Sequence, residues 1–300
     1  HLETIFRRIL SFFSFFDTKG SQNFLFLSTI TPIMNTKNLS NNNLPDVQSS
    51  MDPRNIAIEY VGVRGIELPV TVSSANGVQH TVAQIGMYVA LPAEHKGTHM
   101  SRFLGLLESH AKPLCRDTLV ELIEDMLKTL ESDAGRIDFE FPFFVKKNAP
   151  VSHLESLMNY RVRYKVESKG GVNWVIQTVT VPVTSLCPCS KEISTYGAHN
   201  QRSHVTISAR LKGNLSLEQQ IRYAEESASC ELWSRLKRVD EKYVTESAYE
   251  NPKFVEDLVR DVAVALNKDS NVEAYCVQAE NFESIHNHSA YAQITKGSMD

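Results

Sequence analysis

Hydrophobic residues that alternate with polar ones predict β-strands from about Asn55 onward. The pattern indicates an extended chain through residues 66–72, a turn at Asn76-Gly77, and a second strand over residues 78–91. An Asn-Gly pair between two such runs is typical of a two-residue hairpin turn, because both residue types tolerate a positive φ. We therefore predict an antiparallel hairpin here.

The hydrophobic spacing then changes to that of amphipathic helices. Residues 98–110 and 116–131 each place their apolar residues on one side of a helix, and strands resume over residues 137–145 and 160–166. This order predicts a four-stranded antiparallel sheet with helices on one face. Its other face and its edges lack partners, so we expect neighbouring subunits to close it into a barrel.

The second half of the chain is predicted to repeat this order after a turn at Gly170-Gly171. Strands and helices alternate in the same sense, with strands over residues 172–184, 204–211, 272–280 and 290–294 and helices over residues 217–239 and 252–267. Asn251 is the expected N-cap of the last helix, and Pro252 its first residue. The predicted class is α+β, with two tandem ββααββ-like modules at residues 51–169 and 170–300.

The first fifty residues differ from the rest. Arg7 and Arg8 followed by the apolar residues 9–16 imitate part of a signal peptide, but the apolar run is short and no small-residue cleavage pattern follows. The run is also too short to span a bilayer. We expect residues 1–50 to be a disordered leader or an artificially added extension.

Composition narrows the classes of function. With 42% hydrophobic residues, the 300-residue chain can bury a real core. A net charge of -4 gives no general attraction to nucleic acid or to an anionic membrane, so we expect neither partner. Five cysteines, an odd count without a regular framework, favour a reducing compartment, and we expect the cytoplasm.

The segment at residues 183–203 loses its strand periodicity and gathers chemically active side chains. Cys187, Cys189 and His199 are ligand types that suit zinc or a similar divalent transition metal. Pro188 fixes the backbone between the thiols, so we expect them to point in opposite directions and only one to reach a shared ion. An incomplete protein ligand set suits a catalytic metal, which keeps one position open.

A second interpretation stays open: the two cysteines form a buried or redox-active thiol pair, and His199 is an ordinary loop residue with its hydrogen bonds satisfied. A four-thiolate structural zinc site is disfavoured, because the other cysteines form no second closely spaced pair. Cys115, Cys230 and Cys276 lie in helix or strand patterns and are expected to be small core residues.

The run S-L-C-P-C-S-K-E-I-S-T-Y-G-A-H-N-Q-R-S (residues 185–203) resembles the signature of the prokaryotic type IB GTP cyclohydrolases of the tunnelling-fold superfamily. The resemblance extends through K-G-T-H-M-S-R-F (residues 96–103), E-N-P-K-F-V-E-D-L-V-R-D (residues 250–261) and N-F-E-S-I-H-N-H (residues 281–288). It covers nearly everything from about Asn55 to the end. It implies a tunnelling fold, a cytoplasmic homotetramer with active sites at subunit interfaces, and the hydrolysis of GTP to dihydroneopterin triphosphate and formate in folate biosynthesis.

The resemblance also implies roles for individual residues. Cys187, His199, Glu241 and Glu283 are the implied ligands of a divalent zinc, manganese or iron ion. His286 is expected to deliver a proton as the purine ring opens, because histidine titrates near neutrality. Cys189 remains either a thiol behind the ligands or a redox partner of Cys187.

Substrate binding is assigned to other residues. Glu256 lies beside an apolar helix face and is expected to be half-buried, where it would accept hydrogen bonds from N1–H and the 2-amino group of guanine. Lys96, His99 and Arg102 cluster where a helix begins and are candidates for the triphosphate, as is Arg202. The alternatives are a tunnelling-fold nitrile reductase, which needs no metal, a non-catalytic purine- or metal-binding module, and a scaffold with structural loop cysteines.

Overall fold

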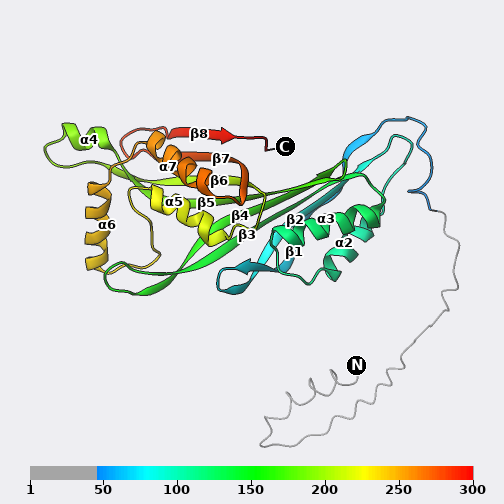
Figure 1. The fold of residues 1–300 in the computed structure, drawn as a ribbon, viewed down its shortest axis with the longest axis horizontal. Coiled ribbons are helices and arrows are strands. Elements are labelled where there is room, and N and C mark those ends of the chain that lie inside the picture. Colours follow the sequence, from blue (N-terminus) through cyan, green and yellow to red (C-terminus); the bar gives the residue numbers. More distant parts are fainter. Residues whose placement is uncertain (1–45, 300) are drawn as a thin grey trace, which may run out of the picture. The chain divides into compact units, whose positions relative to one another are not determined.

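One antiparallel sheet of eight strands organises residues 46–299, the part of the chain that the computed structural model describes (Figure 1). The strands follow each other in chain order across the sheet, with β1 and β8 at its edges. Their bounds are β1 Ile58–Ser74, β2 Gly77–Leu91, β3 Ala134–Asn148, β4 Glu155–Lys169, β5 Val172–Leu186, β6 Asn200–Leu211, β7 Val272–Asn281 and β8 Ala290–Lys296. The predicted mixture of helices with an antiparallel sheet is confirmed.

Both hairpins marked by glycine form as predicted. Ser74 pairs with Gly77 at the end of β1 and β2, and Gly77 has a φ of 118°. Lys169 pairs with Val172 at the next predicted turn, where Gly170 and Gly171 have φ values of 59° and 77°. A type I′ turn needs a positive φ at both central residues, which glycine adopts without strain, and Gly170-Gly171 meets this need. In the first turn only Gly77 has a positive φ.

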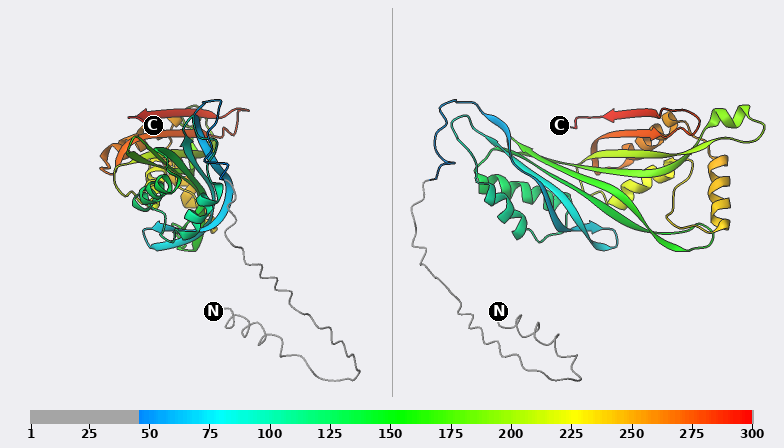
Figure 2. Two further views of the ribbon diagram at one scale, coloured as in Figure 1. Left: turned by 90° about the vertical axis from the view of Figure 1, so that its right-hand side faces the viewer. Right: turned by 180° about the vertical axis from the view of Figure 1, so that it is seen from behind.

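Two groups of helices cover one face of the sheet (Figures 1 and 2). Helices α2 (Met100–Ser109) and α3 (Arg116–Leu130) connect β2 to β3, and α5 (Leu217–Ser227), α6 (Arg238–Glu250) and α7 (Val255–Lys268) connect β6 to β7. Alternate residues of the strands, such as Ile137, Phe139 and Phe141 of β3, join the apolar faces of α3, α5 and α7 in one hydrophobic core. The intervening residues of β3 face away from the helices.

The prediction of one long helix over residues 217–239 is wrong. Helix α5 ends at Ser227, and the chain then crosses towards β5, where Cys230 and Thr184 exchange backbone hydrogen bonds. Lys147 at the end of β3 holds the same segment, because its Nζ donates to the carbonyl of Leu232 at 2.7 Å. Tertiary contacts therefore override the helical pattern between α5 and α6.

The predicted start of the last helix is also wrong. Asn251 ends α6, and α7 begins at Val255 with Phe254 as its N-cap. The side chain of Asn251 is used elsewhere, because its Nδ2 donates to the carbonyls of Ala228 and Ser229. A short helix, α4 (Pro188–Ile193), also appears between β5 and β6, where no helix was predicted.

Only part of the prediction for the remaining cysteines is confirmed. Cys230 is buried, whereas Cys115 and Cys276 are half-buried. Cys115 is the N-cap of α3, and Cys276 lies between the buried residues Tyr275 and Val277 of β7, on the opposite face of the strand. Alternation along a strand explains why Cys276 is outside the core.

The predicted leader at residues 1–50 lies outside the described residues, apart from residues 46–50. The division into two modules stays a prediction, because the sheet runs without interruption from β4 to β5 across the expected boundary. Across residues 46–299, no helix has both the length and the apolar character needed to cross a membrane.

Candidate functional site

Cys187 and His199 lie opposite each other where β5 ends and β6 begins. The last pair of the β5–β6 ladder is Leu186 with Asn200, and the next residues continue the contact, since the backbone N–H of Cys187 donates to the carbonyl of His199 at 3.2 Å. The sheet register therefore brings together two residues that are twelve positions apart in the sequence. Both side chains are half-buried.

Ser190 holds the loop between the two residues in shape. Cys187 is the N-cap of α4, with Pro188 in the first turn, and its Sγ accepts the backbone N–H of Ser190 at 3.5 Å. The hydroxyl of Ser190 donates to the carbonyl of Cys187 at 3.1 Å and accepts the backbone N–H of His199 at 3.2 Å. Cys189 is exposed on α4, so the two thiols sit in different surroundings, as the intervening proline predicts.

A third strand adds a carboxylate to this cluster. Glu283 follows β7, and its Oε1 accepts a hydrogen bond at 3.3 Å from Nε2 of Gln201, the second residue of β6. Oε1 of Gln201 lies 3.0 Å from Nδ1 of His199. The ends of β5, β6 and β7 thus contribute Cys187, His199 with Gln201, and Glu283 to one corner of the sheet.

Gln201 was not singled out from the sequence. The available signal is its position two residues before Ser203 and four before Val205, on the face of β6 that is buried. A buried amide needs hydrogen-bond partners, and here both partners are candidate site residues. Alternation along the strand, followed by the question of what a buried glutamine binds, would have found it.

Glu241 lies apart from this corner. It was expected between two helices, but it is an exposed residue in the first turn of α6. Its neighbour Asp240 is fully buried and accepts hydrogen bonds from the backbone N–H groups of Val151 and Ser152 at 2.9 and 2.8 Å. Burial would raise the pKa of Asp240, but its hydrogen bonds lower it, first that from the Ser152 hydroxyl at 2.6 Å and then those from the backbone N–H groups. They tie the start of α6 to the turn between β3 and β4.

The segment before α7 returns to the corner of the sheet. The backbone N–H of Lys253 donates to the carbonyl of Leu186, the residue before Cys187, at 3.1 Å. Glu256 follows three residues later, but it is exposed in the single chain, so the expected half-burial is wrong. Val255, Leu258 and Val259 turn towards the core, and Glu256 consequently faces outward.

The loop after β7 carries His286 and a second histidine, His288. The rings of His286 and His288 stack with centroids 5.1 Å apart, and both residues are exposed. The base of the loop is anchored on β6, where the N–H of Phe282 donates to the carbonyl of Arg202 at 3.0 Å. Arg202 itself is exposed on β6, one residue after Gln201.

The other candidates for phosphate binding are at the far end of the sheet. Lys96, His99 and Arg102 surround the start of α2, which Figures 1 and 2 show at the opposite end from α4. Nε2 of His99 lies 3.4 Å from Asp46, and Arg102 donates to the carbonyl of Thr129 at 3.2 Å. A single chain therefore does not bring these three residues to the Cys187 loop.

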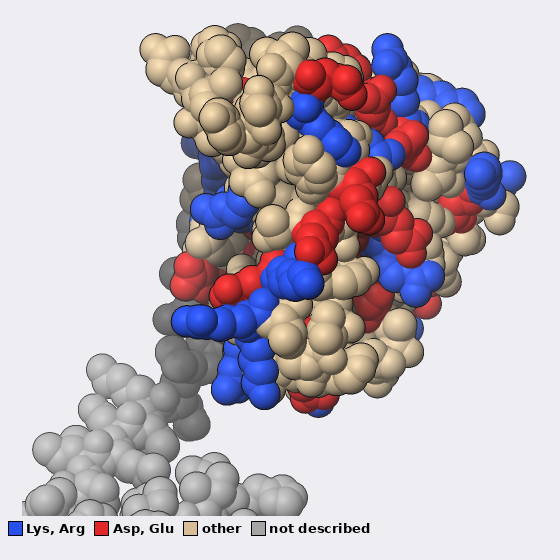
Figure 3. Space-filling model, turned by 90° about the vertical axis from the view of Figure 1, so that its left-hand side faces the viewer, with Lys and Arg blue, Asp and Glu red and all other residues tan. Residues whose placement is uncertain are grey.

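A surface hollow of about 620 Å³ lies beside the Cys187 loop, between residues 195–200 and the last turns of α6. Figure 3 views the molecule from this end. Large apolar side chains are exposed around it, with Ile193 at 85% and Tyr196 at 100% exposure. Lys191 spans the gap, since its Nζ donates to the carbonyl of Tyr249 at 2.6 Å and lies 4.4 Å from that residue's ring centroid.

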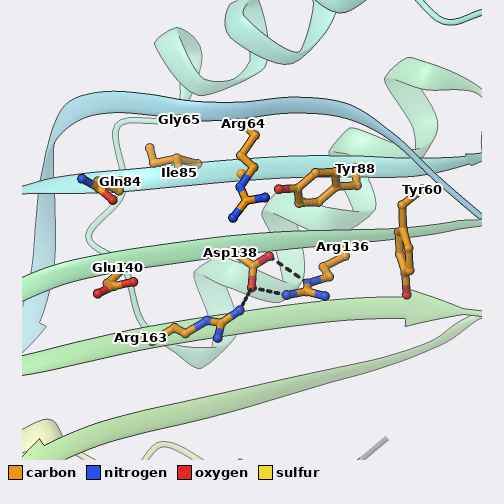
Figure 4. A pocket seen from close by; sticks show the side chains of 11 residues that line it. Tyr60, Arg64, Gly65, Gln84, Ile85, Tyr88, Arg136, Asp138, Glu140 and Arg163 are labelled. Atoms are coloured by element: carbon orange, nitrogen blue, oxygen red, sulfur yellow. Dashed lines mark hydrogen bonds and ion pairs between the residues drawn. The ribbon is translucent and has the colours of Figure 1, made fainter.

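A second hollow, of about 460 Å³, lies on the helix-free face of β1–β4 and contains none of the predicted site residues (Figure 4). Three of its five charged side chains are paired with each other. Asp138 accepts from Nη2 of Arg136 at 3.0 Å and from Nη2 of Arg163 at 2.8 Å. These three groups are thus engaged within the protein, while Arg64 and Glu140 also line the hollow.

The Cys187 corner has the donor types that a divalent transition metal needs. These donors are the thiol of Cys187, the imidazole of His199 and the carboxylate of Glu283, which Gln201 links to His199 through hydrogen bonds. They fit zinc, manganese or iron. Across residues 46–299, no three side chains of His, Cys, Asp or Glu are gathered closely enough in one chain to hold an ion.

Comparison with known proteins gives a consistent result. The profile of the family described as type I GTP cyclohydrolase folE2 matches residues 44–292. GTP cyclohydrolase FolE2 2 of Cupriavidus metallidurans is 57% identical over 251 residues, which are 84% of this chain and 94% of that protein. GTP cyclohydrolase FolE2 of Herminiimonas arsenicoxydans is 59% identical over 253 residues, covering 84% and 97%. Among solved structures, uricase from Arthrobacter globiformis has a TM-score of 0.46 at 9% identity, covering 80% of this chain and 93% of that one.

Proposed function

The chain belongs to the FolE2 family of type I GTP cyclohydrolases, and on this premise we propose that its reaction takes place at the Cys187 corner of the sheet. It is a GTP cyclohydrolase of folate biosynthesis, an enzyme that hydrolyses GTP at C8 and releases formate and dihydroneopterin triphosphate. One observation carries the location of the site. The strand ends set Cys187 and His199 against each other, with the backbone N–H of Cys187 3.2 Å from the carbonyl of His199.

Cys187, His199, Glu283 and Glu241 would hold a divalent zinc, manganese or iron ion. Such an ion would lower the pKa of a bound water to about 7 in the best case and so would supply a nucleophile at neutral pH. The first three residues come from adjacent strand ends, whereas Glu241 is exposed on α6. An exposed ligand on a separate element fits a site that a second subunit completes.

The remaining roles follow from the same corner. His286 would deliver a proton to the purine as its imidazole ring opens, from an exposed loop that is anchored on β6 beside the site. Glu256 would accept the N1–H and 2-amino hydrogen bonds of guanine, because the backbone contact from Lys253 to Leu186 holds the start of α7 beside Cys187.

We place these chains in a homo-oligomer, a tetramer, built on the tunnelling fold. Within the described residues, the edge strands β1 and β8 each have a neighbouring strand on one side only. Ile193 and Tyr196 expose apolar surface beside the site, and Val239 and Tyr249 do so on α6. Lys96, His99 and Arg102 would then reach the triphosphate from a neighbouring subunit, together with Arg202. Five free cysteines support a reducing compartment, the cytoplasm.

The deciding experiment is incubation of the protein with GTP and a divalent ion, followed by measurement of formate and of the fluorescence of the oxidised pterin. Cys187→Ala should remove both signals, whereas Cys276→Ala, a half-buried cysteine on β7, should keep them. Full activity of Cys187→Ala would remove the proposed site. Recovery of GTP unchanged with the unmodified protein would support a binding module instead, and activity that survives exhaustive chelation would remove the ion.

A further inference from the structure

Gln201 joins His199 to Glu283 and has no role in the site as derived so far. Its side chain is almost fully buried, with 8% of the residue exposed. One end of its amide meets Nδ1 of His199 at 3.0 Å, and the other end meets Oε1 of Glu283 at 3.3 Å. Its position between two implied metal ligands suggests that it controls how one of them is presented.

Glu283 determines which way the amide of Gln201 points. An ionised carboxylate only accepts hydrogen bonds, so the NH₂ end of the amide must face it. The carbonyl oxygen of Gln201 then faces His199. The reverse orientation would set the amide oxygen against the carboxylate and leave two buried acceptors without a proton between them.

The amide in turn determines the tautomer of His199. A carbonyl oxygen only accepts, so the hydrogen of the 3.0 Å contact must sit on Nδ1 of the ring. Oγ of Ser284, 3.3 Å from the same nitrogen, can accept from that hydrogen as well. A neutral imidazole carries one hydrogen, and Nε2 is therefore left with the free lone pair.

We propose that Gln201 is a positioning residue that, oriented by Glu283, holds His199 in the Nδ1–H tautomer and presents Nε2 to the divalent ion. The ion at this site rests on the proposed function, whereas the tautomer is a property of the metal-free protein. Partners of this kind behind a histidine ligand typically change metal affinity by about 10- to 100-fold when removed.

Magic-angle-spinning ¹⁵N NMR of metal-free, ¹⁵N-histidine-labelled full-length protein at pH 8 tests the tautomer directly. The His199→Gln spectrum identifies the signal of His199 among the 10 histidines. We expect a protonated Nδ1 in the unmodified protein. In Gln201→Leu the signal should change to a mixture of tautomers or to Nε2–H. The matched control is Gln278→Leu, because Gln278 lies on β7 and bonds Gln293 at 3.0 Å.

Zinc affinity, measured by competition with a chromophoric chelator, gives the second readout. Gln201→Leu should weaken binding by about 10- to 100-fold, and Gln278→Leu should not change it. An Nε2–H tautomer in the unmodified protein, or Nδ1–H together with unchanged zinc affinity in Gln201→Leu, would overturn the proposal.

Two further outcomes separate this proposal from the proposed function. If Gln201→Leu does not fold, Glu283→Ala carries the test, because the amide loses the group that orients it and the tautomers should mix; retention of pure Nδ1–H there overturns the proposal. If Gln201 controls the tautomer but the unmodified protein neither binds a divalent ion nor consumes GTP, the tautomer assignment is supported and the proposed function alone fails.

Discussion

The two polar regions of this sheet differ in what their charged groups already bind. On the helix-free face of β1–β4, Arg136 and Arg163 are both satisfied by Asp138 (Figure 4). At the Cys187 corner, His199 and Glu283 are each fixed on one side by Gln201, and Cys187 is fixed through its backbone. In the first region, the three charged groups Asp138, Arg136 and Arg163 neutralise each other. A catalytic site is better recognised by polar side chains that hydrogen bonds hold in place but that no opposite charge neutralises.

The largest effect should come from removing the thiol of Cys187. We expect Cys187→Ala to abolish measurable turnover, since even partners behind a metal ligand cost about 10- to 100-fold. Size-exclusion chromatography should show the same oligomer as the unmodified protein. An active Cys187→Ala variant would mean that the Cys187 corner is not the site of the reaction.

A smaller loss is expected from Glu256→Ala. Losing two hydrogen bonds to a charged group, at about 1.5–3 kcal/mol each, should lower kcat/KM for GTP by about 100-fold or more. The affinity for the divalent ion should stay unchanged, which chelator competition measures. Equal loss of both properties would assign Glu256 a structural role.

Asp138→Asn tests the other region, the hollow on the helix-free face of β1–β4. The change weakens the contacts to Arg136 and Arg163, so we expect the free energy of unfolding to fall by about 1–2 kcal/mol. Turnover of GTP should remain within about twofold, because the helix-free hollow holds none of the site residues. Urea unfolding and the formate assay measure the two quantities. A large loss of turnover at unchanged stability would show that this hollow takes part in the reaction.

The smallest effect concerns His110, which lies just after α2. Burial, and then the charge of Lys112, lower the pKa of His110 from its ordinary value of 6.5. Below pH 6.5 the unfolded chain takes up a proton that the folded chain resists, so stability should fall as the pH drops towards the lowered pKa. We expect His110→Gln to reduce this slope slightly in urea titrations between pH 7.5 and 5.5. An unchanged slope would mean that other groups cause the acid sensitivity.

The sequence predicted the parts of this fold that depend on local signals. Helix α3 follows its hydrophobic spacing and a Thr118 side chain that accepts the N–H of Cys115, and both glycine turns follow from positive φ. The break after Ser227 could not be predicted locally, because Lys147, eighty residues earlier, holds the crossing segment. Asn251 has a good capping side chain, but that side chain is occupied by a distant loop.

The residues of the site differ in the same way: some can be predicted from local sequence, and others only from tertiary contacts. Cys187 and His199 can be found in one short segment, since they flank a single loop between paired strands. Gln201 needed the register of three strands, because its importance lies only in what it touches. The placement of Glu241 on α6 depends on a contact between the start of that helix and the turn after β3, which no spacing in the sequence reveals.

That contact has an evolutionary consequence. Tips of hairpins commonly accept extra residues, and the exposed turn at Gly170-Gly171 should tolerate them. The six residues between β3 and β4 should not, because Val151 and Ser152 present their amides to Asp240 and so fix the rotation of the helix that carries Glu241. Lengthening the turn between β3 and β4 by one residue would misplace the carboxylate of Glu241, some ninety positions later in the chain. We therefore expect relatives to vary in length at the exposed hairpin turn and to keep the turn between β3 and β4 constant.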